Sequence, residues 1–330
     1  MPTREGKQCF STAGWSSTNQ ARELEKYVKN NFNICNFNTA DAWVIMNKME
    51  ANIKQKIEKY GTPLKEWDIN IKFGIKTGYN EAFIIDEEKR RELIMKDPKS
   101  NEIIKPILRG RDIKRYSYDW NDLYIINTHN GIKSHTGASP RVKDAHTTIN
   151  TGACPRVDVN DYPAIKEHLD KYYDKLQQRQ DKGDTPYNLR NCAYLSEFDK
   201  EKIVYAQMVS EPCFTYDNTG ILINQLCYIL TGNKIKYLIC LLNSKVIAKY
   251  FRSNFPVLGA KGFMIQKDHI ITLPIPLPAP KVETQLEKLV DEILHLKALG
   301  KRTEILELQI DEIVYEMYDL NDEEIRYICK

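Results

Sequence analysis

Apolar residues recur with two different periods along this chain, and the change from one period to the other predicts its elements. A spacing of three or four residues is typical of a helix with one buried face, whereas strict alternation is typical of a half-buried strand. The helical period predicts helices over 46–60, 161–183, 234–251, 282–294 and 306–318. Alternation or short apolar runs predict strands at 67–73, 82–85, 123–126, 203–206 and 221–230.

Several residues indicate where the first two of these helices begin and end. Thr39 is a candidate N-cap for the first helix, with Gly61 as its stop and Pro63 just beyond. Asp161 is expected to cap the second helix, in which Pro163 is tolerated in the first turn. The prolines of LPIPLPAP (273–280) stop a preceding strand.

The last two helices are separated only by a short connection around Gly300, which predicts an antiparallel helical hairpin. The hairpin either stabilises its own domain or docks another domain or chain. We therefore expect an α+β fold, with a mixed or mainly antiparallel sheet core, flanking helices and a C-terminal antiparallel helical hairpin.

Length and composition predict a folded protein of about two domains for its 330 residues. The expected division is an N-terminal helical segment or linker (1–60), a central domain (61–280), and the hairpin with its tail (281–330). Residues 128–158 are polar and rich in Gly, Ser, Thr and His, which predicts a long functional or mobile loop.

Charge is unevenly distributed, although the net charge is only +3. Residues 281–330 contain 7 basic and 13 acidic side chains, a net of −6, so residues 1–280 have a net of +9. A basic body with an acidic tail is compatible with a polyanionic partner for the body.

The 8 cysteines form no C-x-x-C pair, which argues against a zinc site and for reduced thiols in a cytoplasmic protein. The N-terminus has no apolar core of signal-peptide length, and no run of 18 apolar residues predicts a membrane span.

Motifs of complete catalytic sites are not found. The chain contains no G-x-G-x-x-G, P-loop, H-E-x-x-H or G-x-S-x-G motif, and no Asn-Pro-Pro-aromatic tetrapeptide of adenine methyltransferases. Asp68, Glu87 and Lys89 loosely fit a metal-dependent nuclease pattern, although a solvated charge run explains them equally well. A metal site among His129, His135 and His146 remains open on the same terms.

A basic cluster with interleaved aromatic residues is the clearest binding signal. Residues 89–115 contain ten basic and four acidic side chains, and LRGRDIKRYSYDW (108–120) places three arginines beside Tyr116, Tyr118 and Trp120. Arginine matches phosphate and guanine geometry, and lysine supplies positive charge. A solvated face is the alternative interpretation of this cluster.

The order of several segments resembles the target-recognition region of TaqI-type adenine DNA methyltransferases and of the fused type IIG restriction–modification enzymes. The segments, in the family's order, are GTPLKEWDINIKFGIKTGYNEAFIID (61–86), ILRGRDIKRY (107–116), YIINT (124–128), DYPAIKEHLDKYYDKLQQRQDKGDTPYNLRNCAY (161–194), KIVY (202–205), LLNSKVIAKYF (241–251) and LPIPLP (273–278). The resemblance covers about residues 55–320.

This resemblance implies sequence-specific recognition of double-stranded DNA, with the catalytic domains outside this chain. S-adenosylmethionine, and Mg²⁺ for cleavage, are then cofactors of the full enzyme and not of this chain. The resemblance points to three segments for DNA contact: the 76–80 turn, residues 109–115 and the 185–191 loop. With Lys261 from a glycine loop, the candidate DNA-binding residues are Lys76, Thr77, Tyr79, Asn80, Arg109, Arg111, Lys114, Arg115, Arg190, Asn191 and Lys261.

Two other hypotheses stay open beside target recognition. The chain is alternatively a docking or specificity subunit for a separate methyltransferase or nuclease, with the hairpin at 282–318 as the docking element. It is otherwise a metal-dependent nuclease that uses Asp68, Glu87 and Lys89.

Overall fold

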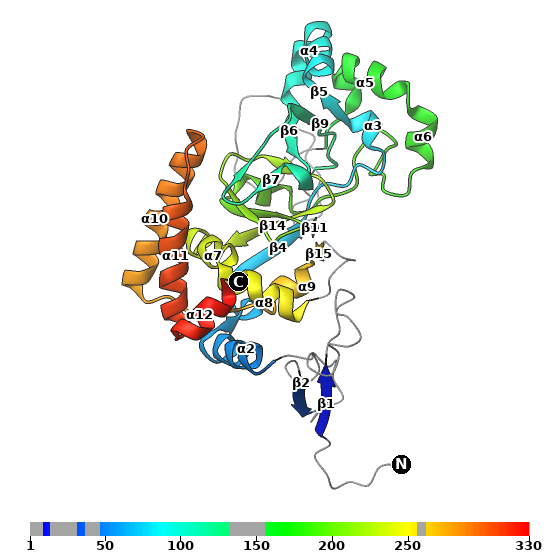
Figure 1. Ribbon diagram of the computed structural model, residues 1–330. Coiled ribbons are helices and arrows are strands. Elements are labelled where there is room, and N and C mark those ends of the chain that lie inside the picture. The colour runs from blue at the N-terminus through cyan, green and yellow to red at the C-terminus, as the bar shows by residue number, and fades with distance from the viewer. Residues whose placement is uncertain (1–8, 14–31, 37–46, 132–155, 256–261, 330) are drawn as a thin grey trace, which may run out of the picture.

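Two four-stranded sheets, surrounded by helices, form the body of the protein (Figure 1). The structure, a computed structural model, describes residues 9–13, 32–36, 47–131, 156–255 and 262–329. In these ranges no helix is both long and apolar enough to cross a membrane.

The helices are α2 (Lys48–Tyr60), α3 (Asn80–Phe83), α4 (Glu87–Lys96), α5 (Pro163–Asp170), α6 (Tyr173–Gln178), α7 (Ile235–Leu242), α8 (Lys245–Asn254), α9 (Lys267–Ile270), α10 (Pro280–Ala298), α11 (Glu304–Met317) and α12 (Asp322–Ile328). The strands are β1 (Cys9–Ala13), β2 (Phe32–Asn36), β3 (Thr62–Pro63), β4 (Ile69–Phe73), β5 (Ile84–Asp86), β6 (Ile104–Leu108), β7 (Ile113–Lys114), β8 (Ser117–Tyr118), β9 (Leu123–Ile126), β10 (Lys202–Ala206), β11 (Met208–Val209), β12 (Phe214–Asp217), β13 (Leu222–Ile223), β14 (Cys227–Gly232), β15 (Phe263–Met264) and β16 (Pro274–Ile275).

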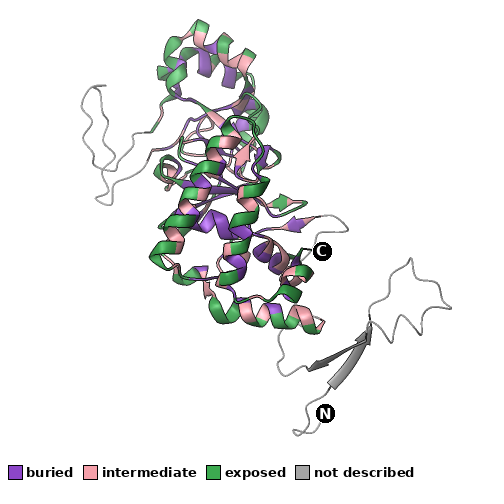
Figure 2. Ribbon diagram, turned by 60° about the vertical axis from the view of Figure 1, so that its left-hand side comes forward, coloured by how far each residue is buried: buried purple, intermediate pink, exposed green. Residues whose placement is uncertain are grey.

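The central sheet, in the order β12-β10-β14-β4, is antiparallel throughout, and its two middle strands, β10 and β14, are buried on both faces. Along β10, Ile203 and Tyr205 face one hydrophobic core, whereas Val204 and Ala206 face a second core. This division follows from the alternation of side chains along a strand. The buried strands lie at the middle of the molecule, with exposed helical faces outside them (Figure 2).

The second sheet has the order β13-β6-β9-β5, in which only the β13–β6 pair is parallel. The sheets described are therefore mainly antiparallel, and the predicted α+β class is confirmed. This second sheet packs with α3, α4 and α5 around the second core.

The first core joins parts of all three predicted chain segments. It contains Ile57 of α2, Leu230 of β14, and Leu286 of α10, each almost fully buried. Helices α7 and α8 lie between the central sheet and the hairpin in this core. The division into three domains was not tested and stays a prediction.

The predicted C-terminal hairpin is present as α10 and α11, and the turn includes Gly300 at φ +64°. This left-handed conformation favours glycine. Two carboxylates of this C-terminal region are buried. Asp311 is 2% exposed, and Glu324, in the helix α12 that follows the hairpin, is 3% exposed. Asp311 accepts a hydrogen bond from the Lys245 backbone N–H, 2.9 Å away, at the start of α8.

The N-terminal boundaries of two helices differ from the predictions. Asn47 caps α2, because its side chain accepts from the Glu50 backbone N–H at 2.9 Å; Thr39 lies outside the described residues. The second helix begins at Pro163, and Asp161 lies in a preceding 3-10 turn that is capped by Asp158.

Interruptions account for the other differences. The predicted helix at 161–183 is divided into α5 and α6, and the helix at 234–251 into α7 and α8. In the second case the buried Asn243 side chain bonds both the N–H and the C=O of Phe214 at 3.0 and 2.9 Å, which fixes a corner. Ser244 then caps α8.

Two predicted strands also contain other structure. The expected strand at 82–85 is half confirmed, because Ala82 and Phe83 end α3 and β5 begins at Ile84. A short apolar run does not distinguish a strand from a buried helical turn. The expected strand at 221–230 is two strands, β13 and β14, separated by a turn at 224–226. Strands at 123–126 and 203–206 are confirmed as β9 and β10.

Candidate nucleic-acid interface

Three loops meet where strands β4, β6 and β13 end. The Ile75 backbone N–H donates to Ile223 O at 2.8 Å, and the Asn224 N–H donates to Leu108 O at 3.0 Å. These bonds place the 74–80 segment, the 109–115 segment and the 224–226 turn next to one another. Sequence reasoning predicted the first two segments and missed the third.

Gly74 makes this meeting sterically possible. A Cβ atom at position 74 would lie 1.9 Å from Asn224 O, a distance that no side chain tolerates. The chain then turns at Gly78, where φ is +69°, and the Thr77 hydroxyl donates to Asn80 Oδ1 at 2.5 Å. Thr77 is 2% exposed, so it supports the turn from inside, whereas Asn80 is exposed.

A cavity of about 290 Å³ lies beside this turn and brings three predicted residues together. Its walls come from the 73–76 and 190–194 segments, and the lining residues are Phe73, Gly74, Ile75, Lys76, Arg190, Asn191, Cys192 and Tyr194. Lys76 and the adjacent pair Arg190 and Asn191, which lie more than a hundred residues further along the chain, therefore face a common space. Arg190 also pairs with Asp181 at 2.6 Å.

The floor of the cavity is neutral and aromatic. Burial raises the pKa of Cys192 to about 11 and the pKa of Tyr194 to about 12, so both groups stay protonated near neutral pH. The Lys72 ammonium lies 5.6 Å from the centre of the Tyr194 ring. The cavity thus combines aromatic faces with positive charge.

Arg179 is a positioning residue that sequence reasoning missed. Its guanidinium donates to the carbonyl oxygens of Thr77 and Asn188, and to that of Pro186 at 3.0 Å, while its carbon Cζ lies 4.6 Å from the Phe83 ring centre. Burial lowers the pKa of Arg179 to about 10, and the group remains charged at neutral pH. Arg179 therefore joins the 76–80 turn to the 185–191 loop.

The predicted arginines at 109 and 111 have different environments. Arg109 donates from Nε and Nη2 to the carboxylate of Asp112, both at 3.1 Å, and Asp112 is almost fully buried. Arg111 is exposed, and its side chain has no hydrogen-bond or ion-pair partner in the described part of the chain. Arg109 thus stabilises the loop, and Arg111 is available for a ligand.

Lys114 and Arg115 point to other partners. Lys114 lies 3.8 Å from an oxygen of Asp119 and donates to Arg111 O at 3.3 Å. Arg115 forms an ion pair with Glu307 of α11 at 2.6 Å, so it connects this loop to the C-terminal hairpin.

Tyr79 and Lys261 complete the set of predicted residues. The Tyr79 hydroxyl accepts from Lys175 Nζ at 2.8 Å and donates to Glu81, and its ring lies 5.9 Å from that of Tyr172. Lys261 lies outside the described residues, as does most of the predicted 128–158 loop.

The nuclease candidates are held in separate contacts. Glu87 pairs with Arg90 and Arg91, and hydrogen bonds from the Tyr124 hydroxyl and Arg91 lower its pKa to about 2. Asp68 instead accepts from Asn233 at 2.7 Å. Within the described ranges, no group of three or more His, Cys, Asp or Glu residues could hold a metal ion.

The chain is similar to several known proteins. A type II methyltransferase, M.MjaIV of Methanocaldococcus jannaschii, is 23% identical over 258 residues, which are 75% of this chain and 78% of the relative. The type IIL restriction–modification enzyme MmeI, solved in complex with DNA, is similar in fold, with a TM-score of 0.59 at 10% identity over 90% of this chain. The type IIG restriction endonuclease BpuSI matches with a TM-score of 0.47 at 12% identity.

The chain spans 38% of the length of each of these two solved enzymes. The family model of the TaqI-like C-terminal specificity domain matches residues 105–275, which is more than half of the chain. This match contains β6 to β16 and both loops that hold Arg111 and Arg190. The protein therefore belongs to the family of TaqI-like C-terminal specificity domains.

Proposed function

We propose that this chain recognises a specific sequence in double-stranded DNA, as the target-recognition part of an adenine-specific type IIG restriction–modification enzyme. One observation carries the proposal: the fold brings Lys76, Arg190 and Asn191 to one cavity, beside the loop that exposes Arg111. The family of specificity domains to which the chain belongs supports it.

The charges and polar groups suit the two tasks of DNA recognition. Lys76, Arg111 and Arg190 offer positive charge for phosphates, which supplies affinity and register. Asn191 offers an amide that can accept from and donate to a base edge, and the half-buried Gln225 in the neighbouring turn offers a second one.

Charge is also separated across the molecule. The acidic hairpin of α10 and α11 lies on the left in Figure 1, whereas β11 and β15, at the edge of the proposed DNA surface, lie on the right. Repulsion between phosphates and the carboxylates of the hairpin therefore favours DNA on the side away from the hairpin.

S-adenosylmethionine and Mg²⁺ are proposed for the full enzyme only. The cavity is lined by Lys76 and Arg190, which disfavour the positive sulfonium group of S-adenosylmethionine. The cavity lining that the structure describes contains no Asp or Glu side chain, the ligands that Mg²⁺ takes from proteins. The methyltransferase and nuclease parts are then supplied by the same polypeptide or by a separate subunit, and the location is cytoplasmic, where the DNA is.

The test is selection from a randomised duplex pool at about physiological salt, followed by sequencing of the bound DNA. Enrichment of one short motif supports recognition by this chain. Arg111→Glu should weaken binding, whereas the same change at Arg302, which is exposed beyond the end of α10, serves as the matched control.

Retention of DNA without any enriched motif would contradict sequence recognition by this chain alone. A lack of retention would contradict the proposal altogether and favour the second hypothesis, a docking subunit. Charge reversal at Arg109 is a poor test, since it would break the ion pair with the buried Asp112.

A further inference from the structure

Leu226 and Met208 are two exposed apolar residues at the edge of the proposed DNA surface, and we call them the apolar projection. Their exposed fractions are 48% and 61%, which are high for large apolar side chains. The Gln207 backbone N–H donates to Leu226 O at 2.8 Å, so Leu226 lies beside Gln207, which precedes Met208 in the chain. Neither residue was identified from the sequence.

The turn that carries Leu226 is fixed by its own hydrogen bonds. Asn224 Oδ1 accepts from the Leu226 backbone N–H at 3.2 Å and from the Cys227 thiol at 3.3 Å, and Asn224 O accepts from the Cys227 N–H at 3.0 Å. The turn also follows β13, whose neighbour in the sheet is β6. Leu226 therefore projects from a rigid support.

Positive groups surround this projection. A Cβ atom at Gly110 would lie 4.0 Å from Leu226 O, so the backbone at Gly110 is close to this turn. Arg111 is the next residue along the chain. On the other side, Gly74 contacts Asn224, and Lys76 follows two residues later. The buried carboxylate of Asp112, two residues after Gly110, is already paired with Arg109.

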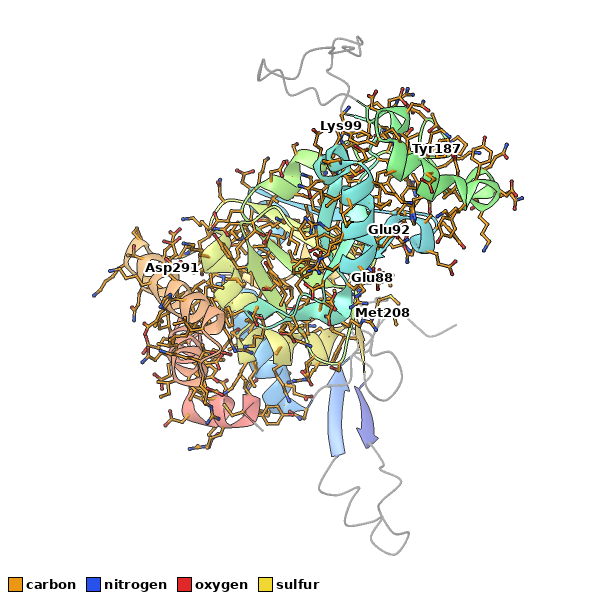
Figure 3. The ribbon with its side chains drawn as sticks, turned by 90° about the horizontal axis from the view of Figure 1, so that it is seen from above. Glu88, Glu92, Lys99, Tyr187, Met208 and Asp291 are labelled. Carbon is orange, nitrogen blue, oxygen red and sulfur yellow. The ribbon has the colours of Figure 1, made fainter. Side chains whose placement is uncertain are left out.

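The projection also lies away from the acidic hairpin. Figure 3 labels Met208 on the right of the molecule and Asp291 of α10 on the left. An apolar tip with cations around it fits a partner that has an apolar interior and an anionic edge. The stacked base pairs of duplex DNA, bordered by phosphates, have this chemistry.

We propose that Leu226, with Met208 beside it, inserts between adjacent base pairs of the bound duplex and unstacks them. This inference rests on the proposed function. Proteins that bend DNA commonly insert Leu, Met or Phe wedges in this manner, and the unstacking is offset by the additional contacts that the bent duplex makes. Leu226 is the wedge because its turn is fixed, and Met208 adapts its flexible side chain to the opened step.

The experiment uses the full chain and the duplex recovered by selection, with 2-aminopurine placed at successive positions. Its fluorescence rises when stacking is lost. We expect a several-fold rise at one step with the wild-type chain, none with Leu226→Ala, and a smaller rise with Met208→Ala. A duplex that carries an abasic site at that step should bind the wild-type chain more tightly, because less unstacking is required.

Two control variants match the size and exposure of the changes. Leu308→Ala removes a leucine that is 49% exposed on α11, and Met95→Ala removes a methionine that is 85% exposed on α4. Both should leave the fluorescence rise unchanged. Leu226→Met should restore most of it, and unchanged thermal unfolding of Leu226→Ala would show that the fold is intact.

The outcomes separate the wedge from the proposed function. Sequence-selective binding without a fluorescence rise at any position overturns the wedge and leaves DNA recognition standing. The same holds if Leu226→Ala gives the wild-type rise. An absence of duplex binding by the wild-type chain overturns both.

Discussion

Arg179 connects two loops, and its hydrogen bond to the Thr77 carbonyl joins residues that are 102 positions apart in the chain. Three carbonyl oxygens converge on one guanidinium, which is 7% exposed. Bonds of this kind involve a charged donor, and each is stronger than a bond between neutral groups. The positions of Lys76 and Asn191 on opposite walls of the cavity therefore depend on a residue that does not line it.

Replacement of Arg179 by methionine should destabilise the protein by on the order of 3 kcal/mol, because three carbonyl groups lose their donor. DNA affinity should fall further than stability alone explains, since both loops are released. Urea unfolding and a DNA titration measure the two effects. Arg179→Lys should not restore binding, because an ammonium group lacks the planar fork.

Replacement of Gln180 by methionine is the matched control, since Gln180 is the exposed neighbour. A stable Arg179→Met variant with wild-type DNA affinity would show that the two loops keep their positions without this guanidinium.

His168 makes stability depend on pH near neutrality. Burial lowers the pKa of His168, and its Nε2 lies 2.9 Å from Ala82 O, which the neutral ring can donate to. The unfolded chain therefore binds more protons as the pH falls below about 6.5, and the free energy of unfolding decreases. This stability is present above that pH and is lost as the pH falls toward the folded pKa.

We expect the free energy of unfolding to fall less for His168→Gln than for the wild type between pH 7.5 and 5.5. The slopes of this free energy against pH should differ by up to about 1.4 kcal/mol per pH unit. Chemical unfolding at a series of pH values measures it. His129, whose pKa burial also lowers, is present in both proteins, so the difference isolates His168. Parallel curves would remove His168 from this account.

At the scale of elements, the C-terminal hairpin is part of the first core. Leu286, Val290 and Ile293 of α10 are fully buried, and α10 packs against α7. The buried face of the hairpin therefore contributes to the same core as the central sheet, as the interpretation of the hairpin as a stabilising element expects. Its outer face, with Ile305 and Leu308 exposed, is still available to a partner.

Leu286→Ala should lower the free energy of unfolding by about 3 kcal/mol, because the change leaves a cavity in the core. Leu308→Ala on the exposed face should cost less than about 0.5 kcal/mol. Truncation at Pro280 should prevent cooperative unfolding entirely, so loss of a partner in that truncation would not identify a docking surface. Circular dichroism with urea unfolding checks all three.

The sequence predicts elements well where a long apolar stripe serves one core. The hairpin helices are of this kind, whereas β9 and β10 were predicted because each is a short run of buried apolar residues. It fails where distant side chains interrupt an element, as Asn243 does by binding Phe214 between α7 and α8. The cavity was predicted in part, through the resemblance that selected Lys76, Arg190 and Asn191, but nothing local in the sequence indicates Arg179 or the Leu226 turn.

At the scale of the whole molecule, the proposed DNA surface presents the cations Lys76, Arg111 and Arg190. Affinity for DNA should therefore fall steeply with salt, and neutralising Lys76, Arg111 and Arg190 together should reduce the slope of log Kobs against log salt by about 0.9 per lost phosphate contact. DNA titrations at several salt concentrations give this slope. Neutralising Arg302, Lys297 and Lys301 around the hairpin turn should leave this slope unchanged. If both triple variants reduced the slope equally, that result would contradict the proposed surface.

The central sheet has one face in each core, and this limits how specificity can be exchanged between relatives. Each residue pair along β10, such as Ile203 and Val204, sends neighbouring side chains to opposite cores. In a chimera joined within 203–230, neighbouring strands of the central sheet would come from two different parent proteins. Both cores would then contain side chains that did not evolve to pack together. New specificity is therefore better obtained by replacing the loops at 76–80, 109–115 and 185–191 on an intact sheet than by transplanting one half of the molecule.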